Sequence, residues 1–262
     1  GTAAAVVQAV ADLDTDPTNF NSTLSAGAAD AADITAIEAA NGTGTINGAA
    51  LTAINGTAAA VVQAITDLDT DPTNFNSTLS AGAVDATDIT AIEAANGTGT
   101  IDGSNLTAIN GTAAAVVQAI ADLDTDPTNF NSTLTAGVVD ATDITTIEAA
   151  NGTGTINGSA LTAINGTAAA VVQAITDLDT DPTNFNSTLS AGAVDATDIT
   201  AIEAANGTGT IDGSALTAIN GTAAAVVQAI ADLDTDPTNF NSTLSAGAVD
   251  ATDITAIEAA NG

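Results

Sequence analysis

The sequence repeats itself every 55 residues, and this period constrains the fold more than any other feature. The segment Gly-Thr-Ala-Ala-Ala-Val-Val-Gln-Ala begins at Gly1 and returns at Gly56, Gly111, Gly166 and Gly221. The repeats therefore occupy residues 1–55, 56–110, 111–165 and 166–220, and a partial fifth repeat occupies 221–262. A single repeat cannot bury its own apolar face, so we expect the copies to stack into one continuous array.

The repeats are nearly identical to one another. The copies over 56–110 and 166–220 differ only where Asn105 is replaced by Ala215. Neither end of the sequence carries a divergent capping repeat of the kind that a free-standing solenoid needs. We therefore expect either part of a longer array or an array whose ends are covered by neighbouring subunits.

Two helices are expected in each repeat. In the second repeat Asp85 is a good N-cap, Asp88 follows at the N3 position, and Asn96-Gly97 supplies a left-handed stop. A second helix is expected after Thr112, where the apolar residues over 116–123 recur at helical spacing.

Short extended segments separate these helices. Ser77–Ser80 and Gly99–Asp102 are bounded by glycine or asparagine turns and are expected to be strands. Leu106 and Ile109 suggest one further helical turn before the next helix. The order β-α-β-α gives two winds of chain per repeat and predicts an α/β solenoid with short parallel strands. An all-helical solenoid, in which these segments are loops, is the alternative. The expected core is built from Ala, Val, Ile and Leu, with one Phe per repeat, such as Phe75.

Composition excludes most classes of function. The 262 residues include no Lys, Arg, His, Cys, Met, Trp or Tyr, and 32 acidic groups give a formal net charge of −32. The usual general bases and thiolate nucleophiles are therefore missing, so we expect neither enzymatic activity nor a small-molecule substrate. Nucleic acid is excluded as a partner by charge. No segment reaches the roughly 18 consecutive apolar residues of a membrane span. The 45% of apolar residues favours a folded chain over a disordered one.

An acidic turn recurs in every repeat and is the strongest candidate for a ligand site. In the second repeat it reads Asp67-Leu68-Asp69-Thr70-Asp71-Pro72, with carboxylates at alternate positions as at the start of calcium loops. The turn follows a helix C-terminus, where the helix dipole disfavours negative charge, so a bound cation would relieve the repulsion. The expected Ca²⁺ ligands are Asp12, Asp14, Asp16, Asp67, Asp69, Asp71, Asp122, Asp124, Asp126, Asp177, Asp179, Asp181, Asp232, Asp234 and Asp236. Pro72 and Thr78 replace the glycine and glutamate of an EF-hand, and a solvated helix-ending turn is the alternative.

N-x-[ST] sequons also recur along the chain. Most begin with Asn-Gly, which turn and C-cap chemistry already explains. The best candidates for N-glycosylation lie outside such pairs, at Asn21, Asn76, Asn131, Asn186 and Asn241.

Two runs carry a resemblance to known proteins. Ala-Thr-Asp-Ile-Thr-Ala-Ile-Glu-Ala-Ala-Asn-Gly and Leu-Thr-Ala-Ile-Asn-Gly-Thr-Ala-Ala-Ala-Val resemble the Ala/Thr/Asp/Gly-rich tandem repeats of giant secreted bacterial surface and filament proteins, those of marine cyanobacteria in particular. The resemblance covers the whole chain and includes no diagnostic catalytic or ligand motif. It implies an extracellular, often calcium-dependent, elongated structural role.

These observations predict a structural component of an extracellular filament, stalk or surface layer at the cell surface. Its expected partners are copies of itself or neighbouring repeats. The repeat region of an adhesin is the alternative. Ice binding through Thr98-Gly99-Thr100, which repeats down the array, is a third hypothesis.

Overall fold

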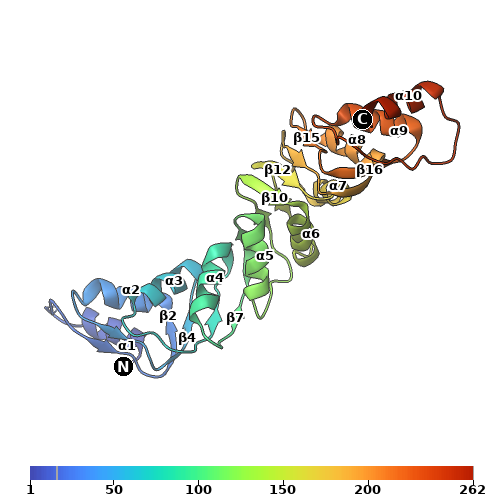
Figure 1. The fold of residues 1–262 in the computed structure, drawn as a ribbon. Coiled ribbons are helices and arrows are strands. Elements are labelled where there is room, and N and C mark those ends of the chain that lie inside the picture. Colours follow the sequence, from blue (N-terminus) through green and yellow to red (C-terminus); the bar gives the residue numbers. More distant parts are fainter. Residues whose placement is uncertain (16, 262) are drawn as a thin grey trace. The chain divides into compact units, whose positions relative to one another are not determined.

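The computed structural model describes residues 1–15 and 17–261 (Figure 1). These residues fall into two compact units. The first contains residues 1–111, 115–132 and 151–154, and the second contains the remaining described residues.

The first unit alternates pairs of short strands with single helices. Its elements are α1 (Ala3–Ala11), β1 (Ser22–Thr23), β2 (Gly27–Asp30), α2 (Ala31–Ala40), β3 (Ile46–Asn47), β4 (Leu51–Asn55), α3 (Ala58–Asp67), β5 (Ser77–Thr78), β6 (Gly82–Asp85), α4 (Ala86–Ala95), β7 (Ile101–Asp102) and β8 (Leu106–Asn110). Two further elements, α5 (Ala113–Asp122) and β9 (Ser132–Thr133), contain residues of both units.

The second unit repeats this order, except that its described residues form no strand between α9 and α10. Its elements are β10 (Gly137–Asp140), α6 (Ala141–Ala150), β11 (Ile156–Asn157), β12 (Leu161–Asn165), α7 (Ala168–Asp177), β13 (Ser187–Thr188), β14 (Gly192–Asp195), α8 (Ala196–Ala205), β15 (Ile211–Asp212), β16 (Leu216–Asn220), α9 (Ala223–Asp232) and α10 (Ala251–Ala260).

Each 55-residue repeat makes two winds of chain, and each wind consists of two strands followed by one helix. Wind A begins with the acidic turn, as in residues 68–95, and ends in a helix of the α4 type. Wind B begins at the Asn-Gly stop, as in residues 41–67, and ends in a helix of the α3 type. The fold is an α/β solenoid, as the repeat predicts, and the all-helical alternative is wrong.

The strands of successive winds pair in parallel. In the first unit β1 pairs with β3, β2 with β4, β5 with β7, and β6 with β8. In the second unit β10 pairs with β12, β13 with β15, and β14 with β16. On its other edge, wind B meets the next wind A through isolated bridges such as Ala53 with Asn76 and Gly56 with Leu79. Helices of successive winds pack on one another within each unit, as α2 does on α3 and α8 on α9 (Figure 1).

The predicted helical turn at Leu106 and Ile109 is wrong, because these residues belong to strand β8. Gly82 pairs with Leu106 and Ala83 with Ala108, so Thr107 is an extra residue in β8. Such a bulge shifts the alternation of side chains. Both Leu106 and Ile109 are buried even though they are three residues apart, which gives the strand a helix-like spacing.

The other predicted elements are present, although the strands expected over Ser77–Ser80 and Gly99–Asp102 shorten to β5 and β7, and one strand is added. Asp85 caps α4 by accepting a hydrogen bond from the Thr87 backbone N–H at 3.0 Å, and Gly97 ends the helix region with a φ of +69°. The strand β6 was not expected from the sequence. Each repeat therefore reads β-β-α-β-β-α rather than β-α-β-α.

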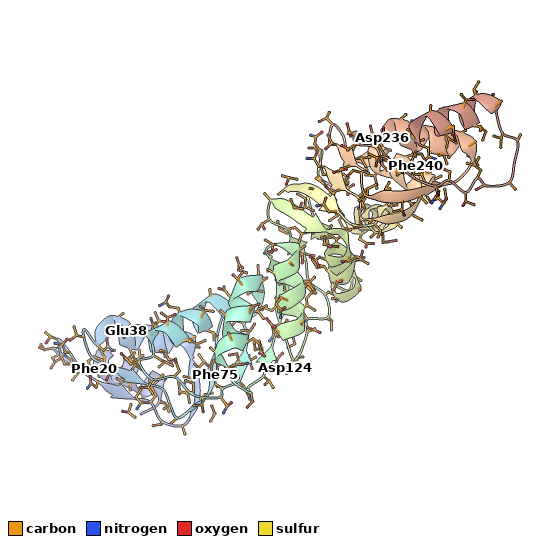
Figure 2. The ribbon with its side chains drawn as sticks, viewed as in Figure 1. Phe20, Glu38, Phe75, Asp124, Asp236 and Phe240 are labelled. Atoms are coloured by element: carbon orange, nitrogen blue, oxygen red, sulfur yellow. The ribbon has the colours of Figure 1, made fainter. Side chains whose placement is uncertain are left out.

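The core is made of small aliphatic side chains and the expected phenylalanines. Ile89 and Ile92 of α4 are fully buried, and so are Ile101 and Ile109 of the strands. Phe75 is buried in an interior wind A, and Phe20 occupies the equivalent position in the first wind A (Figure 2).

Candidate functional site

The first carboxylate of each acidic turn is held by its own helix. Gln63 Nε2 donates to Asp67 Oδ1 at 2.7 Å, one helical turn away. The same pairing links Gln8 with Asp12, Gln118 with Asp122, Gln173 with Asp177, and Gln228 with Asp232. This carboxylate therefore lies in the last turn of a wind-B helix, at the negative end of the helix dipole, which disfavours a negative charge.

The second carboxylate joins two winds. Asp69 Oδ2 accepts a hydrogen bond from the Ile46 backbone N–H at 2.7 Å, and the Asp69 backbone N–H donates to Ile46 O at 3.0 Å. The same pair of hydrogen bonds links Asp124 to Ile101, Asp179 to Ile156, and Asp234 to Ile211. A charged acceptor makes this bond stronger than a neutral one. Asp69 and its equivalents thus act as clamps between wind B and the next wind A.

The third carboxylate of the described turns does not join the first two in a group that could hold a metal ion. Partial burial raises the pKa of Asp71, and the same cause raises the pKa of Asp126 and of Asp181. Asp236 is the equivalent in the last repeat, and Asp16 lies outside the described residues. Across residues 1–15 and 17–261, no group of three acidic side chains is placed to hold a metal ion. The structure therefore gives the first two acids different hydrogen-bond partners, and calcium binding stays a prediction.

Asparagine side chains form a second set of clamps, which the sequence reasoning missed. Asn74 Oδ1 accepts from the Thr98 backbone N–H and from Thr98 Oγ1, both at 2.9 Å. Asn76 Oδ1 accepts from the Thr100 backbone N–H at 3.0 Å. Equivalent bonds join Asn19 to Thr43, Asn21 to Thr45, Asn184 to Thr208, and Asn186 to Thr210. The matched spacing of Asn-Phe-Asn and Thr-Gly-Thr, one wind apart, is the signal that indicates these contacts.

The glycosylation candidates belong to these clamps. Asn21, Asn76 and Asn186 are exposed and use their side-chain oxygen to bind the next wind. Asn131 is exposed, and its backbone N–H donates to Thr107 O at 3.0 Å. Asn241 lies at the C-terminal surface described below. Glycosylation of these residues stays a prediction.

The close approach of successive winds explains why each Thr-Gly-Thr has a glycine, such as Gly99. A Cβ added at Gly99 would collide with the backbone carbonyl of Phe75 in the preceding wind A. The equivalent glycines Gly44, Gly154 and Gly209 meet Phe20, Phe130 and Phe185 in the same way. The glycine of each Thr-Gly-Thr is therefore needed for contact between winds.

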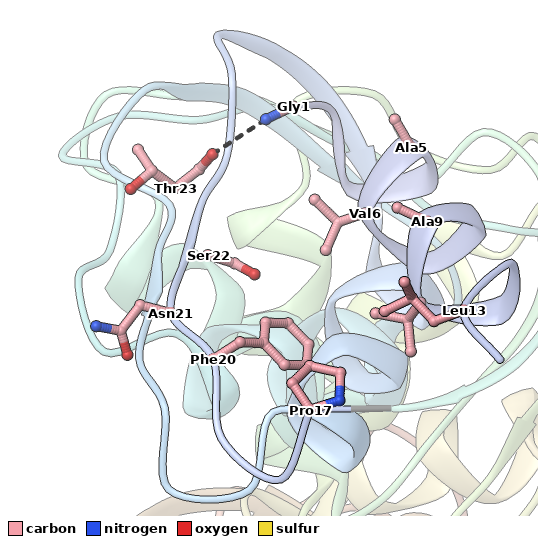
Figure 3. Close-up of a pocket in the computed structure, with 11 residues that line it drawn as sticks. Gly1, Ala5, Val6, Ala9, Leu13, Pro17, Phe20, Asn21, Ser22 and Thr23 are labelled. Carbon is pink, nitrogen blue, oxygen red and sulfur yellow. Dashed lines mark hydrogen bonds between the residues drawn. The ribbon is translucent and has the colours of Figure 1, made fainter. Parts of the chain in front are cut away.

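An apolar groove of about 470 Å³ lies at the N-terminal surface, which is formed by α1 and the first acidic turn (Figure 3). Val6, Leu13 and Phe20 line it, together with Pro17 and Ala9. Leu13 is 51% exposed, whereas its interior equivalent Leu68 is 6% exposed. No described wind covers this surface, although the same side chains are covered in the interior of the array.

A more polar groove of about 350 Å³ lies at the C-terminal surface. It is lined by Thr217, Asn239, Phe240, Asn241 and Asn261. Nearby, Val249 is 45% exposed and Ile254 is 44% exposed. Their interior equivalents Val194 and Ile199 are buried.

Comparison with known proteins does not add a family assignment. No protein-family model matches the chain, and no curated protein matches it. None of the helices among the described residues is long and apolar enough to cross a membrane.

Proposed function

We propose that this chain is a structural spacer, built from stacked winds, in an extracellular filament, stalk or surface layer. The observation that supports this most is the recurrence of the same clamps between winds. Carboxylates of the Asp69 type and amides of the Asn74 and Asn76 types bind the neighbouring wind in repeat after repeat. These polar side chains hold successive winds together, and a spacer needs such contacts along its whole length.

The extracellular location rests on the resemblance of the repeats and on the composition. A chain without Lys or Arg offers no cleavage site to trypsin-like proteases, which suits exposure outside the cell. The high negative charge keeps such a chain soluble and disfavours side-by-side association. Immunogold labelling of intact cells that make the protein tests the location. Surface labelling supports the proposal, and labelling only after permeabilisation contradicts it.

The spacer role is tested by varying the number of repeats. In a stack of winds each added repeat contributes one more set of junctions, so thermal stability should rise with repeat number and then level off. We expect chains of two, three and four repeats to show this rise in melting temperature. Equal melting temperatures would mean that the repeats fold independently and would contradict stacking.

Calcium stiffening remains part of the proposal and needs its own test. The full chain is melted with calcium, with magnesium and with EGTA at equal ionic strength. If the acidic turns hold calcium, calcium alone raises the melting temperature, and a variant with Asp71, Asp126 and Asp181 changed to Asn loses the gain. In the interior turns the first two acids already accept hydrogen bonds, as Asp67 and Asp69 do. A gain in melting temperature equal to that from magnesium would mean that divalent cations only screen the negative charge.

A further inference from the structure

Two Asn-Gly pairs occur in every full repeat, and a third occurs only in alternate repeats. The first two are represented by Asn41-Gly42 and Asn55-Gly56. Glycine has no side chain to hinder its backbone nitrogen, so this nitrogen can attack the preceding carboxamide and release ammonia. Every Asn-Gly pair therefore has the chemistry for deamidation, and its surroundings decide how fast it reacts. At the third position asparagine and aspartate alternate, as Asn47, Asp102, Asn157 and Asp212.

The pair at the end of each wind-A helix is the best protected. Asn96 is fully buried, and its Nδ2 donates to Glu93 Oε2 at 3.2 Å and to Gly99 O at 3.3 Å. Asn41 and Asn206 are equally buried. Conversion to aspartate would remove the amide donor and bury a carboxylate, which costs free energy. This carboxamide is therefore part of the fold and is kept from water.

The pair before each wind-B helix is bonded to the next wind by both of its reacting groups. Asn55 Oδ1 accepts from the Thr78 backbone N–H at 2.9 Å, and Gly56 N–H donates to Thr78 O at 3.4 Å. Asn165 and Gly166 bind Thr188 in the same way. Deamidation here requires that both bonds to the next wind break together.

The third pair has one such bond among the described residues. Gly48 N–H donates to Thr70 O of the next wind A at 2.9 Å. Asn47 is exposed, and its Oδ1 accepts from the Ala49 N–H at 3.0 Å, within its own turn. The carboxamide of Asn47 is therefore open to water, and only its attacking nitrogen is held by the neighbouring wind.

The second unit repeats this arrangement. Asn157 Oδ1 accepts from the Ser159 N–H at 3.0 Å, and Gly158 N–H donates to Thr180 O at 2.9 Å. The two sites thus have the same local bonds and lie in different units.

The alternate repeats show that aspartate fits the same turn. Asp102 Oδ1 accepts from the Ser104 N–H at 3.0 Å, and Asp212 Oδ1 accepts from the Ser214 N–H at 2.9 Å. Asn47 makes the equivalent bond to Ala49. An aspartate produced at position 47 therefore finds its hydrogen bond already in place.

We propose that Asn47-Gly48 and Asn157-Gly158 are sites of spontaneous deamidation, gated by the junction between winds. The Gly48 nitrogen forms a bond to Cγ of Asn47, the Cγ–Nδ2 bond breaks, and ammonia leaves with the proton of the glycine N–H. Water then adds across one of the two C–N bonds of the cyclic imide. Breaking the bond to Cγ gives aspartate, and breaking the backbone bond gives isoaspartate. Water is the only co-reactant.

The gate is the hydrogen bond from Gly48 N–H to Thr70 O, which must open before the nitrogen can attack. Thr70 follows Asp69, whose two hydrogen bonds with Ile46 hold the same junction. Local openings of this kind cost less free energy than global unfolding. The rate at Asn47 therefore reports how often the junction opens. Isoaspartate adds an atom to the backbone at this point and should prevent the junction from closing fully. This modification is separate from the spacer role.

The test incubates the 262-residue chain at mildly alkaline pH in ¹⁸O-labelled water, with and without urea. Mass spectrometry of peptic peptides then locates the labelled carboxylates. In the folded chain we expect Asn47 and Asn157 to convert at least about tenfold faster than the buried asparagines of the Asn96 type, with the Asn55 type between them. In urea all Asn-Gly pairs should react at similar rates. Ala49 and Ser159 distinguish the peptides of the two proposed sites.

Matched variants test the gate. Asp69→Ala should speed the conversion of Asn47 several-fold and leave Asn157 unchanged, whereas Asp179→Ala should do the reverse. Asp69→Asn keeps an acceptor for the same N–H and should have a smaller effect, again at Asn47 alone. If Asp69→Ala unfolds the chain, both sites reach the rate measured in urea, and Asp69→Asn decides instead.

Two results would overturn the proposal. One is conversion of Asn47 no faster than that of Asn96 in the folded chain. The other is equal acceleration of Asn47 and Asn157 by a change at Asp69 in a chain that is still folded.

Discussion

Two winds of nearly identical sequence in the first unit differ sharply in burial. Residues 13–15 and 17–40 belong to the first wind A, and residues 68–95 form an interior wind A with the same acidic turn and the same Asn-Phe-Asn. Phe75 and Leu68 are buried, whereas Phe20 is half-buried and Leu13 is half-exposed. The interior wind has a wind B on both sides, whereas among the described residues the first wind A has a whole wind B after it and only the helix α1 of a wind B before it. The stability of this fold therefore lies in the junctions between winds more than in any wind by itself.

The largest expected effect comes from removing the core phenylalanine. Phe75→Ala should cost about 3–5 kcal/mol of unfolding free energy, because it leaves a cavity in a fully covered core. Phe20→Ala should cost about 1–2 kcal/mol, because that ring is already partly in water. Urea unfolding of the two variants measures the difference, and equal losses would show that both winds are packed alike.

The glycine of Thr-Gly-Thr gives the next effect. Gly99→Ala places a methyl group on the Phe75 carbonyl, which forces the two winds apart and should cost about 3 kcal/mol. Gly1→Ala is the control at the N-terminal surface, because its added Cβ meets Ala5 at an ordinary 3.7 Å. Thermal melting compares the two variants. A Gly99→Ala chain as stable as the control would mean that the winds are not in close contact.

The carboxylate clamp should have a smaller effect. Asp69→Ala leaves the Ile46 N–H without its acceptor at a covered junction, which should cost about 1–3 kcal/mol. Asp14→Ala changes the equivalent residue at the N-terminal surface and should cost less than about 0.5 kcal/mol. Urea unfolding again compares the pair. Similar losses of unfolding free energy in the two variants would mean that the aspartate stabilises its own wind rather than the junction between winds.

The sequence predicts the helices of this fold well because their signals are local. The N-cap at Asp85 and the stop at Asn96-Gly97 lie within one segment, and the structure has both. The strand over Gly82–Asp85 and the bulge at Thr107 depend on pairing between winds, which no local pattern reveals. Short parallel strands also carry weak intrinsic preferences, because packing against neighbours decides them.

The same distinction applies to the acidic turn. Three alternating aspartates suggest a common ligand when only the loop is considered. In the structure the partner of Asp69 is the backbone of Ile46, in the preceding wind B, and the partner of Asp67 is Gln63 in the helix before it. Nothing in the sequence indicates that Asp69 contacts Ile46 until the register of the winds is known.

The smallest expected effect is on pH dependence. Burial, with the nearby Asp85 charge, raises the pKa of Asp88, so the folded state takes up a proton there more readily than the unfolded state. The stabilisation that Asp88 contributes is therefore present at low pH and is lost as the pH rises through its raised pKa.

Hydrogen bonds from Thr87 lower the pKa of Asp85, so its contribution is lost as pH falls through its lowered pKa. We expect a stability maximum at mildly acidic pH, between the two transitions. Melting temperatures from pH 3 to pH 7 should show it near the ordinary aspartate pKa of about 3.9, between the lowered pKa of Asp85 and the raised pKa of Asp88. Asp88→Asn should flatten the decline toward pH 7, and an unchanged profile would contradict this assignment.

Native-state hydrogen exchange tests the central claim most directly. Two samples of the full chain, one labelled with ¹⁵N only in residues 1–55 and one only in residues 56–110, separate equivalent amides of near-identical sequence. If junctions hold the fold together, the amides of Asp69 and Asn76, which are bonded to Ile46 and Thr52, are strongly protected, and those of Asp14 and Asn21 exchange quickly. Equal protection of the two sets would show that each wind is stable by itself and would contradict the account.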